Sequence, residues 1–216
     1  VSVIIPAYNA SNTIERALSS VVANAELVTQ VIVVDNNCTD DTIIKAKNFE
    51  SRLPLKIIQE SRPGSSVARN SGLRLATSEF IQFLDADDEL LQGKLEKQCE
   101  FFNKKDIGFV AGSYLIRNHQ HDATINLNTE GSTNLLLFQG HLGITSSNLW
   151  RKQALDQVQG WNESLKSSQE ADLMFRILKA GFIPALSQSV IVRYGGEKDE
   201  IPDLSALYLL HGFSRC

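Results

Sequence analysis

The stretch Phe80-Ile81-Gln82-Phe83-Leu84-Asp85-Ala86-Asp87-Asp88 joins a short apolar run to three carboxylates within four residues. The apolar run predicts a buried strand, and the carboxylates follow where that strand would reach the surface. Anionic groups packed together repel unless a cation lies among them, and Mg²⁺ and Mn²⁺ bind a few carboxylates while leaving positions for phosphate oxygens. One interpretation is therefore a site for a divalent cation and a diphosphate. The other is a helix N-terminus, where Asp residues cap free N–H groups and oppose the helix dipole.

Three further apolar runs precede this stretch and alternate with segments of helical periodicity. The runs cover residues 1–6, 31–34 and 55–58, and the helical segments follow Asn12, Thr39 and Ser66. Asn12 with Glu15 also fits a capping box. Strands that are apolar on both faces, in the order βαβαβαβ, predict a parallel sheet covered by helices on both sides. Because ligands bind at the carboxyl ends of such strands, Tyr8, Asp35 and Asp85, each just past a strand, are expected to meet in one crevice.

The remaining sequence continues the alternation less regularly. Helices are expected over residues 91–102, from Arg151 and over 167–180, and strands over 107–117, 144–150 and 190–192. Residues 118–133 are polar without a clear period, which favours a loop. No internal repeat or linker is visible, so one domain over residues 1–216 is expected.

The composition is ordinary for a globular protein, with 43% hydrophobic and 21% charged residues. A net charge of −4 with scattered basic residues argues against nucleic acid as a partner. No apolar run is long enough to span a bilayer, and no signal peptide is visible. Cys38, Cys99 and Cys216 are far apart and odd in number, which favours a reduced, cytoplasmic setting. Because the chain starts without Met, we expect a processed or trimmed piece.

Four stretches, in this order, resemble the family 2 glycosyltransferases, which are inverting enzymes of the GT-A fold. They are Val3-Ile4-Ile5-Pro6-Ala7-Tyr8-Asn9, then residues 33–40, then Gly64 to Gly72 followed by Phe83 to Asp88, and finally Gln169-Glu170-Ala171-Asp172-Leu173-Met174-Phe175-Arg176. In the family these are the first strand with its nucleotide loop, the V-D-D-G-S-T-D segment, the ARN-x-G segment with the DxD motif, and the helix with the catalytic base. A single DxD is a weak signal, whereas four ordered matches are specific.

The resemblance implies an α/β GT-A fold with a mostly parallel central sheet flanked by helices. It implies transfer of a sugar from a nucleoside-diphosphate sugar, a UDP-sugar by preference, to an acceptor hydroxyl, assisted by Mn²⁺ or Mg²⁺. Residues 1–102 would bind the nucleotide and residues 103–216 the acceptor.

The resemblance also assigns residues to the donor and the metal. The expected donor contacts are Pro6, Ala7, Tyr8, Asp35, Asn36, Arg69, Asp85, Ala86 and Asp87. Asp87 would hold the metal, with Asp85 and Asp88 as further ligands or ribose contacts. Each assignment has a plainer alternative: Tyr8 as a surface aromatic, Asp35 as a helix cap, and Arg69 as a solvated helix residue.

Glu170 matches the position of the family's general base, where Asp is commoner. Such a base takes the acceptor proton on the face opposite the leaving group. Ser167-Ser168-Gln169-Glu170 also fits a capping box, which would tie Glu170 to the amide of Ser167. Asp172 is the alternative base.

Two departures from the family pattern leave details open. Asn36 replaces the second Asp of the V-D-D motif, which leaves open which nucleotide base the donor site prefers. The stretch Arg193-Tyr194-Gly195-Gly196 directly after Val192 has no His as an extra metal ligand, and Arg193 is an alternative source of positive charge.

Several other residues have two interpretations. His119 and His121 could bind a transition metal, but a polar loop is the better explanation. Trp150 and Trp161 fit either a sugar platform, slightly favoured for Trp161, or the core. Cys38 fits packing better than chemistry.

The resemblance further implies a role in surface polysaccharide or glycolipid synthesis. The acceptor would be a glycan or a lipid-linked chain, and the protein would be cytoplasmic, associated with the inner face of the membrane through segments not present here. A degenerate domain that binds nucleotide or glycan without turnover is the alternative. A nucleotidyltransferase is disfavoured because Pro6-Ala7-Tyr8-Asn9 lacks that class's glycine-rich loop and basic signature.

Overall fold

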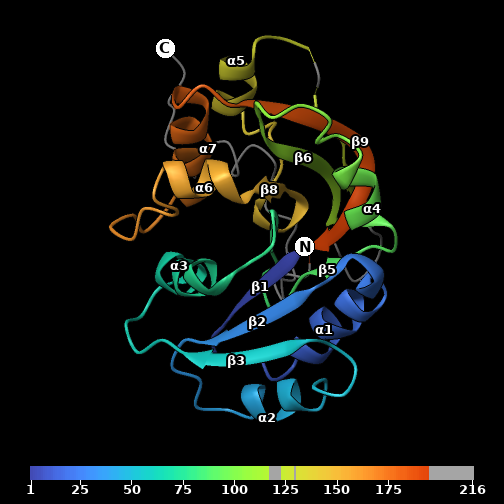
Figure 1. Cartoon of the computed structure of the whole chain (residues 1–216), viewed down its shortest axis with the longest axis vertical. Helices are drawn as coiled ribbons and strands as arrows, with labels where there is room; N and C mark the ends of the chain where they lie inside the picture. The colour runs from blue at the N-terminus through green and yellow to red at the C-terminus, as the bar shows by residue number, and fades with distance from the viewer. Residues whose placement is uncertain (117–122, 129, 195–216) are drawn as a thin grey trace.

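The computed structural model describes residues 1–116, 123–128 and 130–194, whose strands form one sheet (Figure 1). The strand order is β3-β2-β1-β4-β8-β6-β9-β5, with β7 beside β6. Strands β1 (Ser2–Ala7), β2 (Gln30–Asp35), β3 (Leu55–Gln59) and β4 (Phe80–Phe83) are mutually parallel. They alternate with α1 (Ile14–Val22), α2 (Thr42–Lys47) and α3 (Ser65–Leu75), as predicted.

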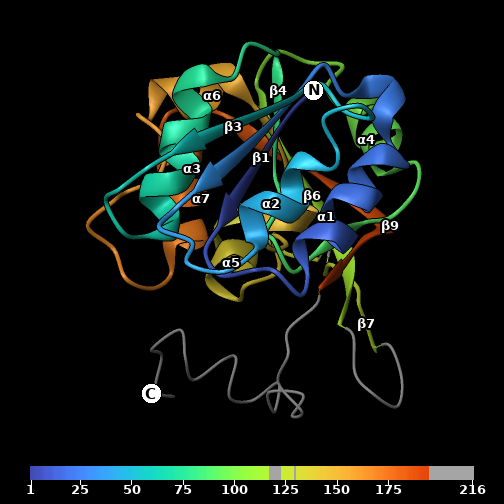
Figure 2. The same cartoon turned by 90° about the horizontal axis from the view of Figure 1, so that it is seen from below.

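The apolar strands are buried on both faces. Along β1, Val3 and Ile5 pack with Leu18 of α1, whereas Ile4 packs with Ala68 of α3 in a second core cluster. Accordingly, α3, α6 (Lys152–Gln157) and α7 (Gln169–Lys179) lie on one side of the sheet, and α1 and α4 (Lys94–Cys99) lie on the other (Figure 2). This two-sided burial explains why the strand sequences are continuous apolar runs.

The second part of the chain extends the sheet beyond β4, with strands of both orientations. The added strands are β5 (Glu89–Leu90), β6 (Ile107–Ile116), β7 (Ala123–Ile125), β8 (Leu149–Arg151) and β9 (Ile183–Tyr194). β8 lies antiparallel between β4 and β6, β9 runs parallel to β6, and β5 pairs antiparallel with β9. β8 therefore joins the parallel part to the rest of the sheet.

Several expected boundaries are wrong. Residues 145–147 form a 3₁₀ turn, η2 (Thr145–Ser147), where a strand was expected. The amide of Ile144 donates to Ser147 Oγ at 2.9 Å, so a side chain takes a bond that a strand would give to its neighbour. The N-cap of α1 is Thr13, without a side-chain cap, so the Asn12–Glu15 capping box is not formed.

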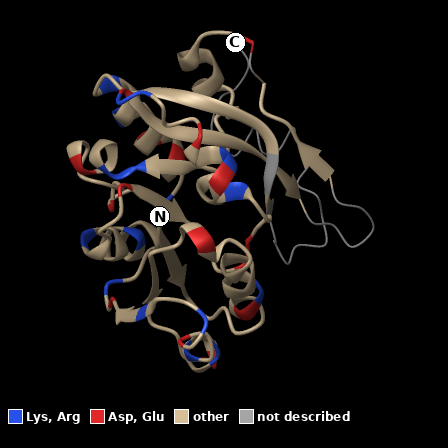
Figure 3. Ribbon diagram, turned by 45° about the vertical axis from the view of Figure 1, so that its right-hand side comes forward, with Lys and Arg blue, Asp and Glu red and all other residues tan. Residues whose placement is uncertain are grey.

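The described part of the polar segment after β6 contains regular structure where a loop was expected. It contains β7 and ends at α5 (Thr133–Phe138), which is capped by the Ser132 hydroxyl through the Leu135 amide at 3.3 Å. His119 and His121 lie outside the described residues. No helix in the described ranges is long and apolar enough to cross a membrane. Lys and Arg are interspersed with Asp and Glu in the view of Figure 3.

Candidate active site

A cleft of about 810 Å³ opens at the carboxyl ends of the parallel strands. Its lining comes from the end of β1, the loops after β1, β2, β3 and β4, and the start of α3: Pro6, Ala7, Tyr8, Asn9, Ala10, Asn12, Thr13, Asn36, Asn37, Pro63, Gly64, Ser65, Arg69, Asp85, Ala86 and Asp87. Eight of the nine expected donor contacts are in this set; the exception is Asp35. In the sheet register Ala7 lies opposite Asp35, so β1 and β2 end at the same level and their loops meet as expected.

The first loop presents Tyr8 to solvent, with 68% of the residue exposed at the cleft. An exposed ring in a cleft is able to stack on a flat ligand. Behind it, the Cys38 thiol donates to the Ala7 carbonyl at 3.3 Å and packs against the core cluster that contains α1. Burial raises the pKa of the Cys38 thiol. A protonated, packed thiol agrees with the packing interpretation of Cys38.

The side chains of Asp35 and Asn36 form hydrogen bonds with the backbone of the surrounding loops. Asp35 Oδ1 accepts from the Cys38 amide at 2.8 Å, which closes the turn after β2; α2 begins only at Thr42, so Asp35 caps no helix. Asn36 is 6% exposed, and its Nδ2 donates to the carbonyls of Glu60 at 2.8 Å and Arg62 at 2.7 Å. Its Oδ1 accepts from the Gly64 amide at 2.9 Å. Asn36 thus ties the loop before α3 to β2. Its side-chain amide is hydrogen-bonded to protein backbone, whereas a contact to the nucleotide base of the donor was expected.

Arg69 is held between an anion and an aromatic ring. Its Nη2 lies 2.7 Å from Asp85 Oδ1, and its guanidinium carbon lies 4.6 Å from the centroid of Trp161. The residue is 5% exposed although it lines the cleft, so the solvated-helix interpretation is wrong. A buried guanidinium that is paired and stacked is fixed in orientation.

Trp150 and Trp161 belong to the core. They are 0% and 2% exposed, and Trp161 packs edge-on against Phe83 with centroids 5.2 Å apart. The sugar-platform interpretation is therefore wrong for both. The ring of Trp161 instead packs against the guanidinium of Arg69.

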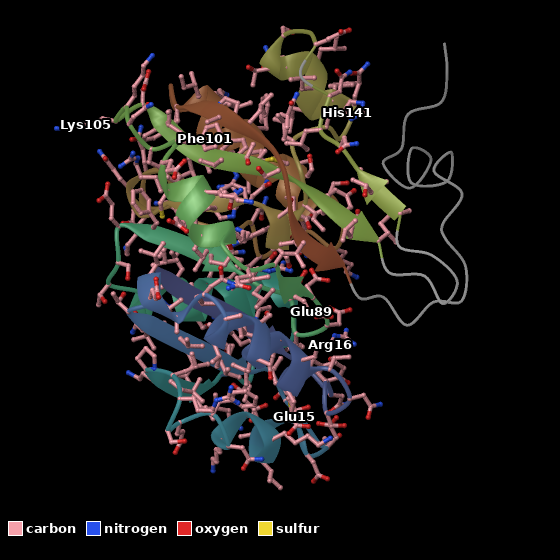
Figure 4. All side chains as sticks on the ribbon, turned by 90° about the vertical axis from the view of Figure 1, so that its right-hand side faces the viewer. Glu15, Arg16, Glu89, Phe101, Lys105 and His141 are labelled. Carbon is pink, nitrogen blue, oxygen red and sulfur yellow. The ribbon has the colours of Figure 1, made fainter. Side chains whose placement is uncertain are left out.

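The Asp85–Asp88 loop is fixed from two sides. On one side the Asp85 amide donates to Ser146 Oγ at 3.1 Å. On the other, Arg16 of α1 donates to the Asp87 carbonyl at 2.6 Å and pairs with Glu89 at 2.9 Å (Figure 4). These contacts hold the backbone of the loop, whose Asp87 lines the cleft.

Asp88 does not share that position. It is 1% exposed and is absent from the cleft lining, so the structure does not bring it to the expected metal site. The helix-cap interpretation of this stretch is wrong as well, because α4 begins at Lys94 with Gly93 at its N-cap.

The carboxylates at the cleft fit a divalent cation that shares its ligands with a substrate. Within the described ranges, no group of three or more His, Cys, Asp or Glu residues is placed to hold a metal by itself. Mg²⁺ sites that act on phosphates commonly use one or two carboxylates, and water and phosphate oxygens supply the rest. Asp87 and the Asp85 oxygen that does not face Arg69 are suitable for that role.

Glu170 lies in the first turn of α7 and reaches back to the η2 turn. Its Oε1 accepts from the Thr145 hydroxyl at 2.5 Å. The N-cap is Ser168, with φ 54° and no side-chain cap, so the capping box from Ser167 is not formed. Asp172 is engaged with Arg176 at 2.7 Å, which argues against it as the alternative base.

Glu170 is linked to the cleft by the preceding residue, Gln169. Gln169 Oε1 accepts from Ser65 Oγ at 3.0 Å and from Arg69 Nη1 at 3.4 Å, and both donors line the cleft. Thr145, Ser146 and Gln169 were not expected at the site. The run Thr145-Ser146-Ser147-Asn148 carries the side chains typical of turns, a signal that the apolar residues around it obscured.

The comparisons with known proteins agree with this arrangement. The family model described as "Glycosyl transferase family 2" matches residues 2–162. The Escherichia coli protein named UDP-Glc:alpha-D-GlcNAc-diphosphoundecaprenol beta-1,3-glucosyltransferase WfgD is 38% identical over 120 residues, which cover 55% of this chain and 47% of that protein. The match spans about half the length of WfgD and of the Bacillus subtilis protein TuaG, and less of other curated relatives.

Two solved structures share the fold at low sequence identity. S. aureus TarS 1–349 in complex with UDP-GlcNAc has a TM-score of 0.78 and 21% identity, over 92% of this chain and 59% of that one. The mannosyltransferase PcManGT from Pyrobaculum calidifontis, in complex with GDP-Man and Mn²⁺, has a TM-score of 0.75 and 19% identity, over 97% and 62%. These likenesses confirm the GT-A fold expected from the sequence.

The family match takes in the parallel strands, the loops that line the cleft and the Asp85-Ala86-Asp87 motif between Arg69 and the η2 turn. The chain therefore belongs to glycosyl transferase family 2.

Proposed function

We propose that this chain is a metal-dependent inverting glycosyltransferase that moves a sugar from a UDP-sugar to an acceptor hydroxyl. One observation carries the proposal: Asp85 and Glu170 bind adjacent residues of one turn. The Asp85 amide bonds to Ser146 and the Glu170 carboxylate bonds to Thr145. The Asp85-Ala86-Asp87 motif is suited to binding a metal ion together with the donor diphosphate, and the Glu170 carboxylate is suited to act as the general base. The turn thereby holds the two near each other.

The residues have distinct chemical tasks in this reaction. Glu170 would take the proton of the acceptor hydroxyl, and the Thr145 hydrogen bond on one of its oxygens keeps the carboxylate oriented. Arg69, fixed by Trp161, would offset charge on the departing diphosphate. A bound Mn²⁺ or Mg²⁺, held by Asp87 and Asp85, would supply further positive charge for that leaving group.

The relatives support the substrate classes in this proposal. The name of WfgD specifies a UDP-sugar donor and a diphosphoundecaprenol-linked acceptor, and the TarS complex contains UDP-GlcNAc. We extend these to a lipid-linked or glycan acceptor here, in surface polysaccharide or glycolipid synthesis at the inner face of the membrane. Residues 1–102 would hold the donor, and residues 103–216 the acceptor.

Binding is tested by thermal shift with UDP, alone and with Mn²⁺. A ligand at about 100 times its Kd stabilises the fold by about 2.7 kcal/mol, a shift of several degrees for a chain of this size. Asp87→Asn should abolish the part of the shift that depends on Mn²⁺. The control is Asp106→Asn, which removes an exposed carboxylate far along the chain. No stabilisation by any nucleoside diphosphate with metal would refute the proposal.

Turnover is tested by nucleotide release over a panel of sugar donors. Glu170→Gln should lower kcat about 100-fold or more while donor KM changes little, because a missing base affects the chemical step. Glu15→Gln is the matched control, since Glu15 also lies in the first turn of its helix but is exposed (Figure 4). Binding without release or transfer for any donor would instead favour the non-catalytic alternative.

A further inference from the structure

Three polar side chains are completely buried behind the candidate site. Gln82 of β4 and Lys94 and Gln98 of α4 are each 0% exposed. The mechanism proposed above uses none of them. Burying a lysine and two amides among apolar residues is costly unless their hydrogen bonds are satisfied, so their arrangement calls for a physical reason.

The lysine contacts the oxygen end of both amides. Its Nζ donates to Gln82 Oε1 and to Gln98 Oε1. The NH₂ group of each amide meets a backbone carbonyl of the Ser146–Ser147 segment, and since a carbonyl can only accept, the amide oxygen is the end that faces Lys94. Each amide is therefore turned so that its NH₂ group points away from Lys94.

Both NH₂ groups point to the η2 turn. Gln82 Nε2 donates to the Ser146 carbonyl at 2.9 Å, and Gln98 Nε2 donates to the Ser147 carbonyl at 2.9 Å. Gln98 also donates to the Val110 carbonyl of β6 at 3.1 Å, so the same amide ties the turn to the sheet. Two consecutive carbonyls of a three-residue turn are thus fixed by one buried group.

The other side of the turn carries the candidate site. The hydroxyl of Thr145 binds Glu170, and the hydroxyl of Ser146 binds the amide of Asp85. The turn therefore has its backbone held from behind by Gln82 and Gln98 and its hydroxyls directed to the two halves of the site.

Protonation of Lys94 is not required for this arrangement. Burial lowers the pKa of the Lys94 ammonium well below its usual range, and Cys99 opposes that change. A neutral amine still has two N–H groups, one for each amide oxygen. The orientation of the amides is kept in either state.

We propose that Gln82, Lys94 and Gln98 are positioning residues for sugar transfer: they fix the Thr145–Ser147 turn and thereby set Asp85 and Glu170 relative to each other. This inference rests on the proposed function. A misplacement of about 1 Å at reacting groups can lower a rate about 100-fold, so a loosened turn should affect kcat.

The test uses Gln82→Glu and Gln98→Glu. Each keeps the oxygen that faces Lys94 but replaces the NH₂ group that holds a turn carbonyl. Gln153→Glu on α6 is the control, since Gln153 is exposed. Both buried variants should lower kcat at least 10-fold with donor KM within about twofold, whereas the control should change neither.

Amide hydrogen exchange supplies a second readout that does not need turnover. In both buried variants the amides of Asp85, Ser147 and Asn148 should exchange at least 10-fold faster, while those of β1 stay unchanged. Unchanged exchange at the turn, or a change in KM without a change in kcat, would overturn the inference.

The two proposals fail in different ways. Absence of nucleotide release by the wild-type chain would refute the proposed function, and the exchange comparison would still decide whether these residues hold the turn. Should Gln82→Glu not fold, Gln82→Met, which buries no charge, tests the same contact.

Discussion

Asn36 makes three hydrogen bonds that an aspartate could not all make in this fold. Its Nδ2 meets two carbonyls, those of Glu60 and Arg62, and its Oδ1 meets the amide of Gly64. A carboxylate could accept from Gly64, but its second oxygen would face two carbonyl oxygens without a proton between them. The asparagine at this point of the family motif thus has a structural explanation in the loop between β3 and α3.

Asn36→Asp should therefore destabilise the protein. Loss of two buried hydrogen bonds, with an anion left against carbonyls, is expected to lower the free energy of unfolding by about 2–4 kcal/mol. Urea denaturation measures the change. Asn128→Asp is the control, because exposed Asn128 accepts from the Glu130 amide through its Oδ1 at 2.9 Å, and aspartate can do the same. Equal stability of the two variants would contradict this account.

The candidate site was predictable residue by residue where a motif carried it. Tyr8 and Asp85 line one cleft as the order of strands indicated, and Arg69 and Asp87 line it too, as the family resemblance implied. The hydrogen-bond partners of Asn36 and the burial of Trp161 were not predictable. They depend on how loops from distant parts of the chain pack against one another. Local patterns carry no information on which distant carbonyl an amide will meet.

At the scale of elements, α3 lies unusually close to β1. A Cβ added to Gly72 would overlap the side chain of Ile4, which is fully buried in the sheet. Ala otherwise favours helices over Gly by about 1 kcal/mol, so helix propensity and packing make opposite predictions for this position. The close approach also brings Arg69, one turn earlier in α3, to the carboxyl end of β4.

Packing should decide the outcome. We expect Gly72→Ala to lower the free energy of unfolding by about 1–3 kcal/mol, since a well-packed core tolerates extra methyl groups poorly. Thermal denaturation would show a fall in Tm of several degrees. Ser19→Ala, at an exposed position of α1, should be neutral or stabilising. A gain in stability for Gly72→Ala would show that α3 can move away from β1.

Elements were predictable in the parallel part and less so beyond it. Both faces of β1 to β4 are covered, so their sequences are continuous apolar runs with clear ends. The η2 turn lies among buried residues and is held by side chains, so its burial resembled that of a strand. β9 is longer than expected because it continues along β6 through register shifts.

At the scale of the molecule, the two parts of the chain are joined at α3. Asn70 donates to the Trp161 carbonyl at 2.9 Å and accepts from its amide at 2.8 Å, and Ser65 binds Gln169. On the other face of the sheet, Lys94 links β4 to the η2 turn through Gln82 and Gln98. The site therefore lies between two sets of contacts that cross from one part to the other.

The buried lysine makes the stability of the whole chain depend on pH. The unfolded chain keeps Lys94 protonated up to about pH 10.5, whereas burial lowers the pKa in the folded state. Between the two pKa values the unfolded state binds more protons, so the free energy of unfolding contributed by this group rises with pH. Below the folded pKa the contribution is constant and unfavourable.

Lys94→Met should remove this dependence. The stability of wild type minus that of the variant is expected to increase with pH, by at most about 1.4 kcal/mol per unit, within the window that ends near pH 10.5. Urea denaturation of both proteins from pH 6.5 to 9.5 measures the difference, in which titrating groups that do not interact with Lys94 cancel; Cys99 interacts with Lys94 and is the exception. Lys97→Met, exposed on the same helix, should give curves parallel to wild type. Parallel curves for Lys94→Met as well would mean that Lys94 keeps its ordinary pKa in the folded chain, and that the network around Gln82 and Gln98 is solvated well enough to hold a full charge.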